Sequence, residues 1–187
     1  MAANGNARAV VLLADGFEEI EAATPADVLR RAGIETIIAG VCGLEARGSR
    51  GLIYRADAIL ETLAGGFDLV VLPGGMPGAA NIAASATARA LAEKTLANGG
   101  RVAAICAAPA VALAAWGLLE GRRATCYPGM ETMFPPGAAF VSDQVVEDGN
   151  LITSRGPGTA LEFALRLASL LAGEETAERL ARDMLFR

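Results

Sequence analysis

The chain has 187 residues, of which 53% are hydrophobic and none is histidine, and its formal net charge is −5 at pH 7. This length suits one domain, residues 1–187, that buries roughly 70% of the surface its unfolded chain exposes. Charged residues interrupt every apolar run before the roughly 18 residues of a membrane span, and there is no basic cluster, so neither a membrane nor nucleic acid is an expected partner.

Apolar segments typical of buried strands alternate with segments of helical periodicity. Strands are predicted over residues 7–13, 34–41, 67–72, 101–105 and 151–153, and residues 51–54 form a short strand or one arm of a hairpin. Helices are predicted over residues 17–32, 86–98, 107–116 and from Thr159 to Ala172. The Asp148-Gly149 pair indicates a hairpin turn before the last strand. The alternation predicts an α/β fold, with a flavodoxin-like, doubly wound, mostly parallel sheet and helices on both faces.

Cys106 lies where the buried strand 101–105 ends and the helix 107–116 begins, within one residue. A thiol there stands at the carboxyl edge of a parallel sheet, where open α/β folds build their sites. It faces the unpaired N–H groups and the positive dipole end of the helix, which favour the reactive thiolate. The small neighbours Ala107 and Ala108 leave the sulfur approachable, as in a nucleophile elbow. The alternative is a packing role, since free cysteine is among the most buried residue types.

Glu21 is the second candidate, because of its place on the helix 17–32. At about 100° per residue, the core-facing stripe of this helix runs through Phe17, Ile20, Thr24, Val28 and Ala32. Glu21 is predicted to point into that stripe, whereas Glu18 and Glu19 point away. Pro25 lacks the donor that would pair with the Glu21 carbonyl, which opens this turn. A carboxylate among apolar side chains needs a partner or a raised pKa, so Glu21 is a candidate acid or base. Alternatively, Glu21 tips out to solvent or pairs with an arginine.

The glycine turn Pro73-Gly74-Gly75 follows the strand 67–72 and therefore reaches the same sheet edge as Cys106. Gly74 and Gly75 could present backbone N–H groups to an oxyanion there. A plain strand-to-helix turn is the alternative. The sequence contains neither the GKS or GKT of a phosphate loop nor GxGxxG, so a nucleotide phosphate site is not indicated.

The segment Gly156-Pro157-Gly158-Thr159 resembles an anion-binding helix start. Thr159 and Glu162 have the spacing of a capping box, which would already use some of the free N–H groups. A structural role is therefore preferred for this segment.

The other two cysteines, Cys42 and Cys126, lack the setting of Cys106 and are interpreted as structural. With an odd number of distant cysteines, no CxxC and no histidine, neither a metal site nor a disulfide framework is expected. The N-terminal residues lack the basic and apolar segments of a signal peptide, so a reducing, cytoplasmic location is predicted, and an organelle or the nucleus is not excluded.

Four segments together resemble the DJ-1/PfpI superfamily, and specifically its branch of Parkinsonism-associated deglycases. In chain order they are LADGFEEIEAATPADVLRRAGI, VVLPGGMPGA, AAICAAPA and TSRGPGTALEFAL, which extend over almost the whole sequence. The resemblance implies a flavodoxin-like fold that forms homodimers. It also implies that Cys106 is an oxidation-sensitive nucleophile, that Glu21 is hydrogen-bonded to it, and that the Gly75 and Ala107 amides line the pocket.

The resemblance further implies a cofactor-free activity on small dicarbonyls, with deglycation, oxidative-stress sensing and chaperone activity as other family attributes. We therefore expect a glutathione-independent glyoxalase that uses Cys106 and Glu21, without a cofactor. The alternative is a redox sensor or chaperone in which oxidation of Cys106 to the sulfinate is the functional event.

Three positions depart from the family pattern. Many members carry a histidine-proline pair near the nucleophile, whereas this chain has Tyr127 before Pro128, and Tyr127 could supply a hydroxyl there instead. Without histidine, the Cys-His pair of the protease-like and amidotransferase-like branches is excluded. Met76 replaces an asparagine of some relatives, and Arg55 replaces the secondary cysteine of the animal proteins.

Overall fold

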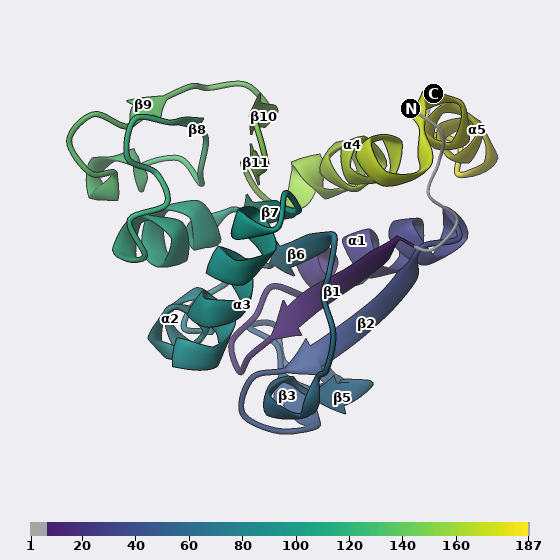
Figure 1. The fold of residues 1–187 in the computed structure, drawn as a ribbon, viewed down its shortest axis with the longest axis horizontal. Coiled ribbons are helices and arrows are strands. Elements are labelled where there is room, and N and C mark those ends of the chain that lie inside the picture. Colours follow the sequence, from purple (N-terminus) through teal and green to yellow (C-terminus); the bar gives the residue numbers. More distant parts are fainter. Residues whose placement is uncertain (1–6, 187) are drawn as a thin grey trace.

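A computed structural model describes residues 7–186, and its centre is one seven-stranded sheet (Figure 1). The strand order is β10-β11-β7-β6-β1-β2-β5. The strands are β1 (Arg8–Leu13), β2 (Glu35–Gly40), β5 (Ala58–Ile59), β6 (Leu69–Leu72), β7 (Arg101–Ile105), β10 (Val145–Asp148) and β11 (Leu151–Ser154). All neighbouring pairs are parallel except β10 and β11. The predicted doubly wound, mostly parallel α/β fold is thereby confirmed.

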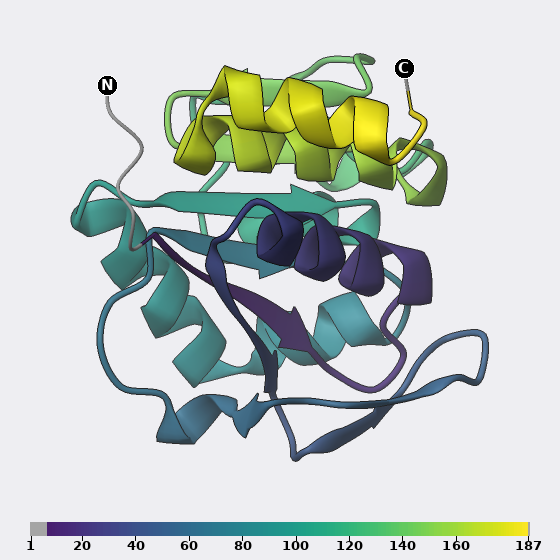
Figure 2. The ribbon, with the colours of Figure 1, turned by 90° about the vertical axis from the view of Figure 1, so that its right-hand side faces the viewer.

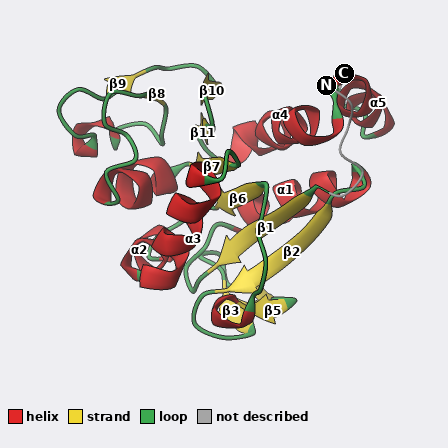
Figure 3. Ribbon diagram, in the orientation of Figure 1, coloured by secondary structure: helices red, strands yellow, loops and turns green. Residues whose placement is uncertain are grey.

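Helices cover both faces of this sheet (Figures 2 and 3). They are α1 (Glu19–Arg31), α2 (Gly78–Ala84), α3 (Ala86–Ala97), α4 (Ala160–Ala172) and α5 (Glu174–Asp183). On one face α1 packs against α4, which packs in turn against α5, while α2 and α3 lie together against the other. The central strands β1, β6 and β7 are therefore buried on both sides, which is why they contain continuous apolar runs.

A helical segment follows β7 directly, as predicted, and its middle part, Pro109–Leu113, is a π-helix. Pro109 lacks the backbone N–H of a regular helix, and π-helical turns are frequent at functional sites. Single 3-10 turns occur at Leu60–Thr62, Glu131–Met133 and Pro157–Thr159.

The predicted hairpin turn after Asp148 is confirmed. Asp148 of β10 pairs with Leu151 of β11, and the two-residue loop between them contains Gly149 with a φ of 61°. The arm predicted at residues 51–54 belongs to a second hairpin, formed by β3 (Glu45–Arg47) and β4 (Ile53–Arg55). A further short pair, β8 (Arg123–Ala124) and β9 (Ala139–Phe140), was not predicted, and neither were β5, α2 or α5.

The predicted capping box of Thr159 and Glu162 is wrong. The Thr159 amide donates to the Gly156 carbonyl at 2.9 Å, and the Thr159 hydroxyl contacts Gly156 and Ser154. Because the 3-10 turn Pro157–Thr159 precedes α4, Thr159 is held by its own turn. The Glu162 carboxylate is left without a capping role.

Within residues 7–186, we find no helix whose length and apolar character would let it cross a membrane.

Candidate active site

Cys106 occupies a sharp turn between β7 and the helical segment that follows it. Its φ is 64°, a left-handed backbone conformation that non-glycine residues adopt rarely. Two backbone hydrogen bonds hold the turn: the Cys106 amide donates to the Ser154 carbonyl at 2.9 Å, and the Cys106 carbonyl accepts from the Tyr127 amide at 2.8 Å. Such a strained strand-to-helix turn presents a side chain at the carboxyl edge of the sheet, as in a nucleophile elbow.

Glu21 lies on the first turn of α1 and has no solvent-exposed surface. Its Oε2 accepts a hydrogen bond from the Gly74 amide at 2.9 Å, whereas its Oε1 is buried without a hydrogen-bond partner among residues 7–186. Hydrogen bonding with the Cys106 thiol also acts on this carboxyl group. The prediction that Glu21 points into the core is confirmed, and the alternatives of a solvent-exposed or arginine-paired carboxylate are wrong.

The prediction for the other residues of this helix is less accurate. Ile20 is 51% exposed, whereas Glu18 and Glu19, which were predicted to point away, are only 9% and 4% exposed. Hydrogen bonds explain their burial: Glu18 Oε2 accepts from the Glu21 amide at 2.9 Å, and Glu19 Oε1 accepts from the Arg50 amide at 2.7 Å. Periodicity alone does not reveal such partners.

Gly74 and Gly75 bring the two candidates together. A Cβ on Gly74 would lie 2.7 Å from Cys106 Cβ, 2.7 Å from Glu21 Oε2 and 2.9 Å from the Ala107 amide nitrogen. Gly75 has a φ of 81°, and a Cβ there would lie 2.4 Å from the Glu18 amide nitrogen. The turn is therefore closely packed against both α1 and the Cys106 elbow, and a side chain at either glycine would separate them.

Burial dominates the electrostatics of the Glu21–Cys106 pair. Desolvation raises the pKa of Glu21 to about 7, although hydrogen bonds from Cys106 and Gly74 lower it. Desolvation and the neighbouring Glu21 carboxylate raise the pKa of Cys106 to about 12, although hydrogen bonds from the Gly75 and Ala107 amides lower it. The Ala107 amide at the helix start does favour the thiolate, as predicted, but burial and the nearby negative charge outweigh the two amides.

The two groups are coupled, since part of the rise at Cys106 comes from the charge on Glu21. When Glu21 holds a proton, that repulsion disappears. Above pH 7 the pair therefore holds one proton and one negative charge, which the Gly74 amide favours on the carboxylate and the Gly75 and Ala107 amides favour on the sulfur.

Tyr127 contacts Cys106 through its backbone amide, which donates to the Cys106 carbonyl. Its side chain is 48% exposed and lies beside Gly156, where an added Cβ would be 3.5 Å from Tyr127 Cδ2. The sequence predicted a structural role for the segment that begins at Gly156 and a position away from the core for Glu18, so neither residue was predicted to belong to the site. The only signal for Glu18 was its position three residues before Glu21 at the start of a helix.

The remaining cysteines differ from Cys106 in exposure. Cys42 is exposed and Cys126 is fully buried, and all three cysteines are free thiols. No group of three or more carboxylate, thiol or imidazole side chains in residues 7–186 could hold a metal ion.

Comparison with known proteins identifies relatives of this chain. Residues 7–170 match the model of the DJ-1/PfpI family. The chain is 47% identical to protein dj-1beta of Drosophila melanogaster over 180 residues, which is 95% of this chain and 96% of the relative. It is 34% identical to the glutathione-independent glyoxalase DJR-1.2 of Caenorhabditis elegans over 94% of both chains.

Two solved structures are similar to this protein over almost its whole length. The crystal structure of Drosophila melanogaster DJ-1beta superposes with a TM-score of 0.92 at 45% identity and covers 96% of this chain and 98% of its own. Oxidized Toxoplasma gondii DJ-1 also has a TM-score of 0.92, at 38% identity with the same coverage.

Proposed function

Because the chain belongs to the DJ-1/PfpI family, we propose that it is a glutathione-independent glyoxalase that converts methylglyoxal to lactate and glyoxal to glycolate. The observation that carries this proposal is the buried Glu21 carboxyl, whose pKa is raised to about 7 beside the Cys106 thiol. An acid–base group works best when its pKa lies near the operating pH. The relative named a glutathione-independent glyoxalase supports the same activity.

In the first step, the Cys106 sulfur adds to the aldehyde carbon of methylglyoxal while Glu21 accepts the thiol proton. The electron pair of the C=O π bond moves to the aldehyde oxygen. The Gly75 and Ala107 amides, which hydrogen-bond the sulfur in the free protein, would also stabilise the new oxyanion. Glu21 then returns its proton to this oxygen, which gives a hemithioacetal.

In the second step, the Glu21 carboxylate removes the hydrogen from the former aldehyde carbon, and an enediolate forms. Glu21 delivers that proton to the neighbouring carbon, and the hydroxyl proton passes from the first oxygen to the second. One carbon is oxidised and its neighbour reduced, so no external redox partner is needed, and the product is a lactoyl thioester. Water then cleaves the thioester, which releases lactate and restores the thiol.

The test is lactate formation from methylglyoxal by the purified protein in the absence of glutathione. The proposal expects turnover by the wild type and none by Cys106→Ala. Undiminished lactate production by Cys106→Ala would exclude this function for the site. Assaying a glycated amine in parallel examines deglycation, which would use the same nucleophile.

A second candidate function is redox sensing. It is favoured by the nearly buried thiol, 8% exposed, next to a carboxyl group that can hydrogen-bond an oxidised sulfur, and by the oxidized state of the similar Toxoplasma gondii protein. Negligible dicarbonyl turnover together with selective oxidation of Cys106 to a stable sulfinate by peroxide would favour this function over the glyoxalase. Aggregation suppression that survives Cys106→Ala would instead favour a chaperone.

We also propose that the protein is a homodimer. Three large apolar side chains on α1 and the β3–β4 hairpin are exposed: Ile20 at 51%, Leu52 at 56% and Ile53 at 61%. The two elements are in contact, because Glu19, which precedes Ile20, accepts a hydrogen bond from the Leu52 amide. Exposed apolar groups of this kind mark protein interfaces. Light scattering should show a dimer, and Ile53→Glu should produce a monomer if this surface is the interface.

A further inference from the structure

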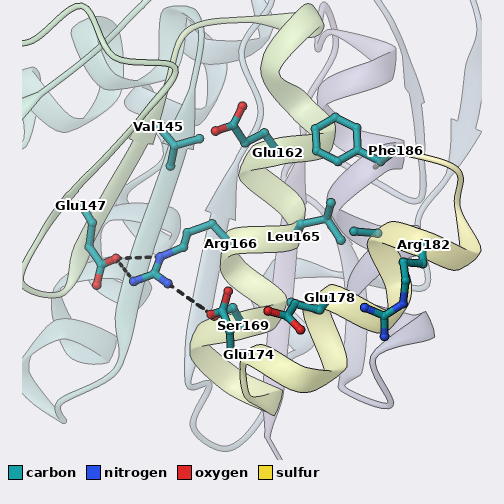
Figure 4. A pocket seen from close by; sticks show the side chains of 12 residues that line it. Val145, Glu147, Glu162, Leu165, Arg166, Ser169, Glu174, Glu178, Arg182 and Phe186 are labelled. Carbon is teal, nitrogen blue, oxygen red and sulfur yellow. Dashed lines mark hydrogen bonds and ion pairs between the residues drawn. The ribbon is translucent and has the colours of Figure 1, made fainter.

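A separate cavity lies between α4 and α5 and is closed on one side by β10 (Figure 4). Its volume is about 650 Å³, within the range of small-molecule sites in proteins. None of the residues of the candidate active site lines it. The cavity is therefore a second place where a ligand could bind.

The cavity has an apolar surface. Val145 of β10, Leu165 of α4, Ala177 and Ala181 of α5, and Phe186 supply it. Figure 4 shows Leu165 between the two helices and the Phe186 ring at one end. Burial of a ligand's apolar body here would contribute binding energy in proportion to the area removed from water.

The charged side chains that line the cavity are mostly acidic: Glu147, Glu162, Glu174 and Glu178 against Arg166 and Arg182. Arg166 is already engaged, because its Nε donates to Glu147 at 2.9 Å and its Nη1 lies 3.8 Å from Glu174. Its charge is therefore balanced within the protein. An anionic ligand at Arg166 would have to displace one of these carboxylates.

Two carboxylates remain unpaired. Within residues 7–186, neither Glu162 nor Glu178 makes a side-chain hydrogen bond or an ion pair with another residue. Glu162 is free because Thr159, its expected capping partner, is held by Gly156 instead. Arg182 follows Glu178 by one helical turn but lies beyond ion-pair distance from it, so within residues 7–186 Arg182 is unpaired as well, and the unpaired charges of the lining are two negative and one positive. The two free carboxylates come from the two helices on either side of the cavity (Figure 4).

We propose that this cavity binds a small organic cation, with an aromatic or alkyl body against the apolar surface and an ammonium group beside Glu162 or Glu178. A cation gains from the excess of carboxylates, whereas a neutral analogue keeps only the apolar contacts. An anion of the same size meets repulsion from the two free carboxylates, which the single unpaired arginine, Arg182, offsets only in part. This proposal is independent of the chemistry at Cys106.

The test compares three ligands of matched shape: 2-phenylethylammonium, 2-phenylethanol and phenylacetate. Each is titrated into the isotopically labelled full-length protein at low ionic strength, and amide chemical shifts are recorded. We expect the cation to shift amides of α4 and α5 and to bind more tightly than the alcohol, with phenylacetate the weakest. Equal binding of the three ligands, or shifts confined to other elements, would overturn the proposal.

Variants identify the groups responsible. Glu162→Gln and Glu178→Gln should each weaken binding of 2-phenylethylammonium roughly two- to fivefold, the size of a partly exposed ion pair. Glu175→Gln is the matched control, since Glu175 lies on α5 but does not line the cavity. Cys106→Ala should also bind the probe normally. If Glu175→Gln weakens binding as much as the two cavity variants do, the effect is one of net charge and the site is refuted.

Discussion

The Glu21 carboxylate accepts a hydrogen bond from the Gly74 backbone amide, at 2.9 Å, and no arginine in residues 7–186 forms an ion pair with it. One neutral amide does not compensate for the complete burial of a carboxylate, which is why the pKa of Glu21 rises to about 7. The second carboxylate oxygen is left for the Cys106 thiol or a substrate. The proposed proton transfers therefore depend on a group that is costly to ionise in the folded protein.

The free-energy cost of ionising Glu21 in the folded protein predicts an unusual dependence of stability on pH. The ordinary pKa of Glu21, 4.5, applies in the unfolded chain, and the folded value is about 7. Between these values the folded state binds more protons than the unfolded state, so the Glu21 contribution to stability is fully present below pH 4.5 and is lost as pH rises through 7. The total loss from this group is about 3 kcal/mol.

Glu21→Gln should abolish this part of the pH dependence and should make the protein more stable than the wild type at pH 8. Glutamine keeps an acceptor for the Gly74 amide and cannot ionise. Urea unfolding of both proteins at pH 5 and pH 8 measures the difference. Parallel stability curves for the two proteins would show that Glu21 is not destabilised by burial.

Alkylation of Cys106 should respond to the same substitution. Glu21→Gln removes the negative charge that raises the thiol pKa, so iodoacetamide should modify Cys106 faster than in the wild type above pH 7. Glu21→Asp keeps the negative charge but shortens the reach of the carboxylate to Gly74 and Cys106. The pH dependence of Cys106 alkylation in this variant should therefore differ from that of both the wild type and Glu21→Gln. The exposed Cys42 in each sample provides an internal reference. Identical Cys106 profiles for all three proteins would mean that Glu21 does not act on the sulfur.

The close packing of Gly74 predicts that Gly74→Ala damages both stability and activity. The new methyl group would lie 2.7 Å from Cys106 Cβ and from Glu21 Oε2, so the two must separate. We expect a loss of about 1–3 kcal/mol, typical of overpacking, together with a loss of turnover. Gly66→Ala is a suitable control, because a Cβ at Gly66 has no atom within 4 Å. Similar thermal unfolding of the two variants would contradict the packing described for this turn.

The left-handed backbone of Cys106 can be tested without its sulfur. Cys106→Gly and Cys106→Ala both remove the thiol, but only glycine adopts a φ of 64° without strain. We expect the glycine variant to be more stable than the alanine variant by about 1 kcal/mol. Greater stability of the alanine variant in urea unfolding would show that the turn is not strained.

The sequence was sufficient to predict the central fold, because the strands of a parallel sheet are continuous apolar runs such as 69–72 and 101–105. It was less informative for short or charged elements. The α5 helix has only three buried residues, Ala177, Leu180 and Ala181, and the β8–β9 pair is two residues long on each strand. Such segments contain too few apolar residues to show a helical or strand periodicity.

The candidate active site was also predicted only in part. Cys106 and Glu21 could be predicted because one follows a buried strand and the other interrupts an apolar stripe. The burial of Glu19 could not, because it depends on the Arg50 and Leu52 amides of a distant hairpin. The effect of burial on the thiol pKa could not be predicted either, because desolvation of Cys106 depends on tertiary packing.

The most direct test of the central claim is a single-turnover reaction of Glu21→Gln with methylglyoxal in the absence of glutathione. Mass spectrometry of the intact protein follows the adduct on Cys106, and lactate is measured in the same samples. In Glu21→Gln the adduct can still form from the thiolate fraction of Cys106, which the loss of the Glu21 charge increases. If Cys106 is the nucleophile and Glu21 moves the proton between the substrate carbons, the variant should accumulate this methylglyoxal adduct and release almost no lactate, whereas the wild type releases lactate. Lactate release by Glu21→Gln at the wild-type rate would contradict the account.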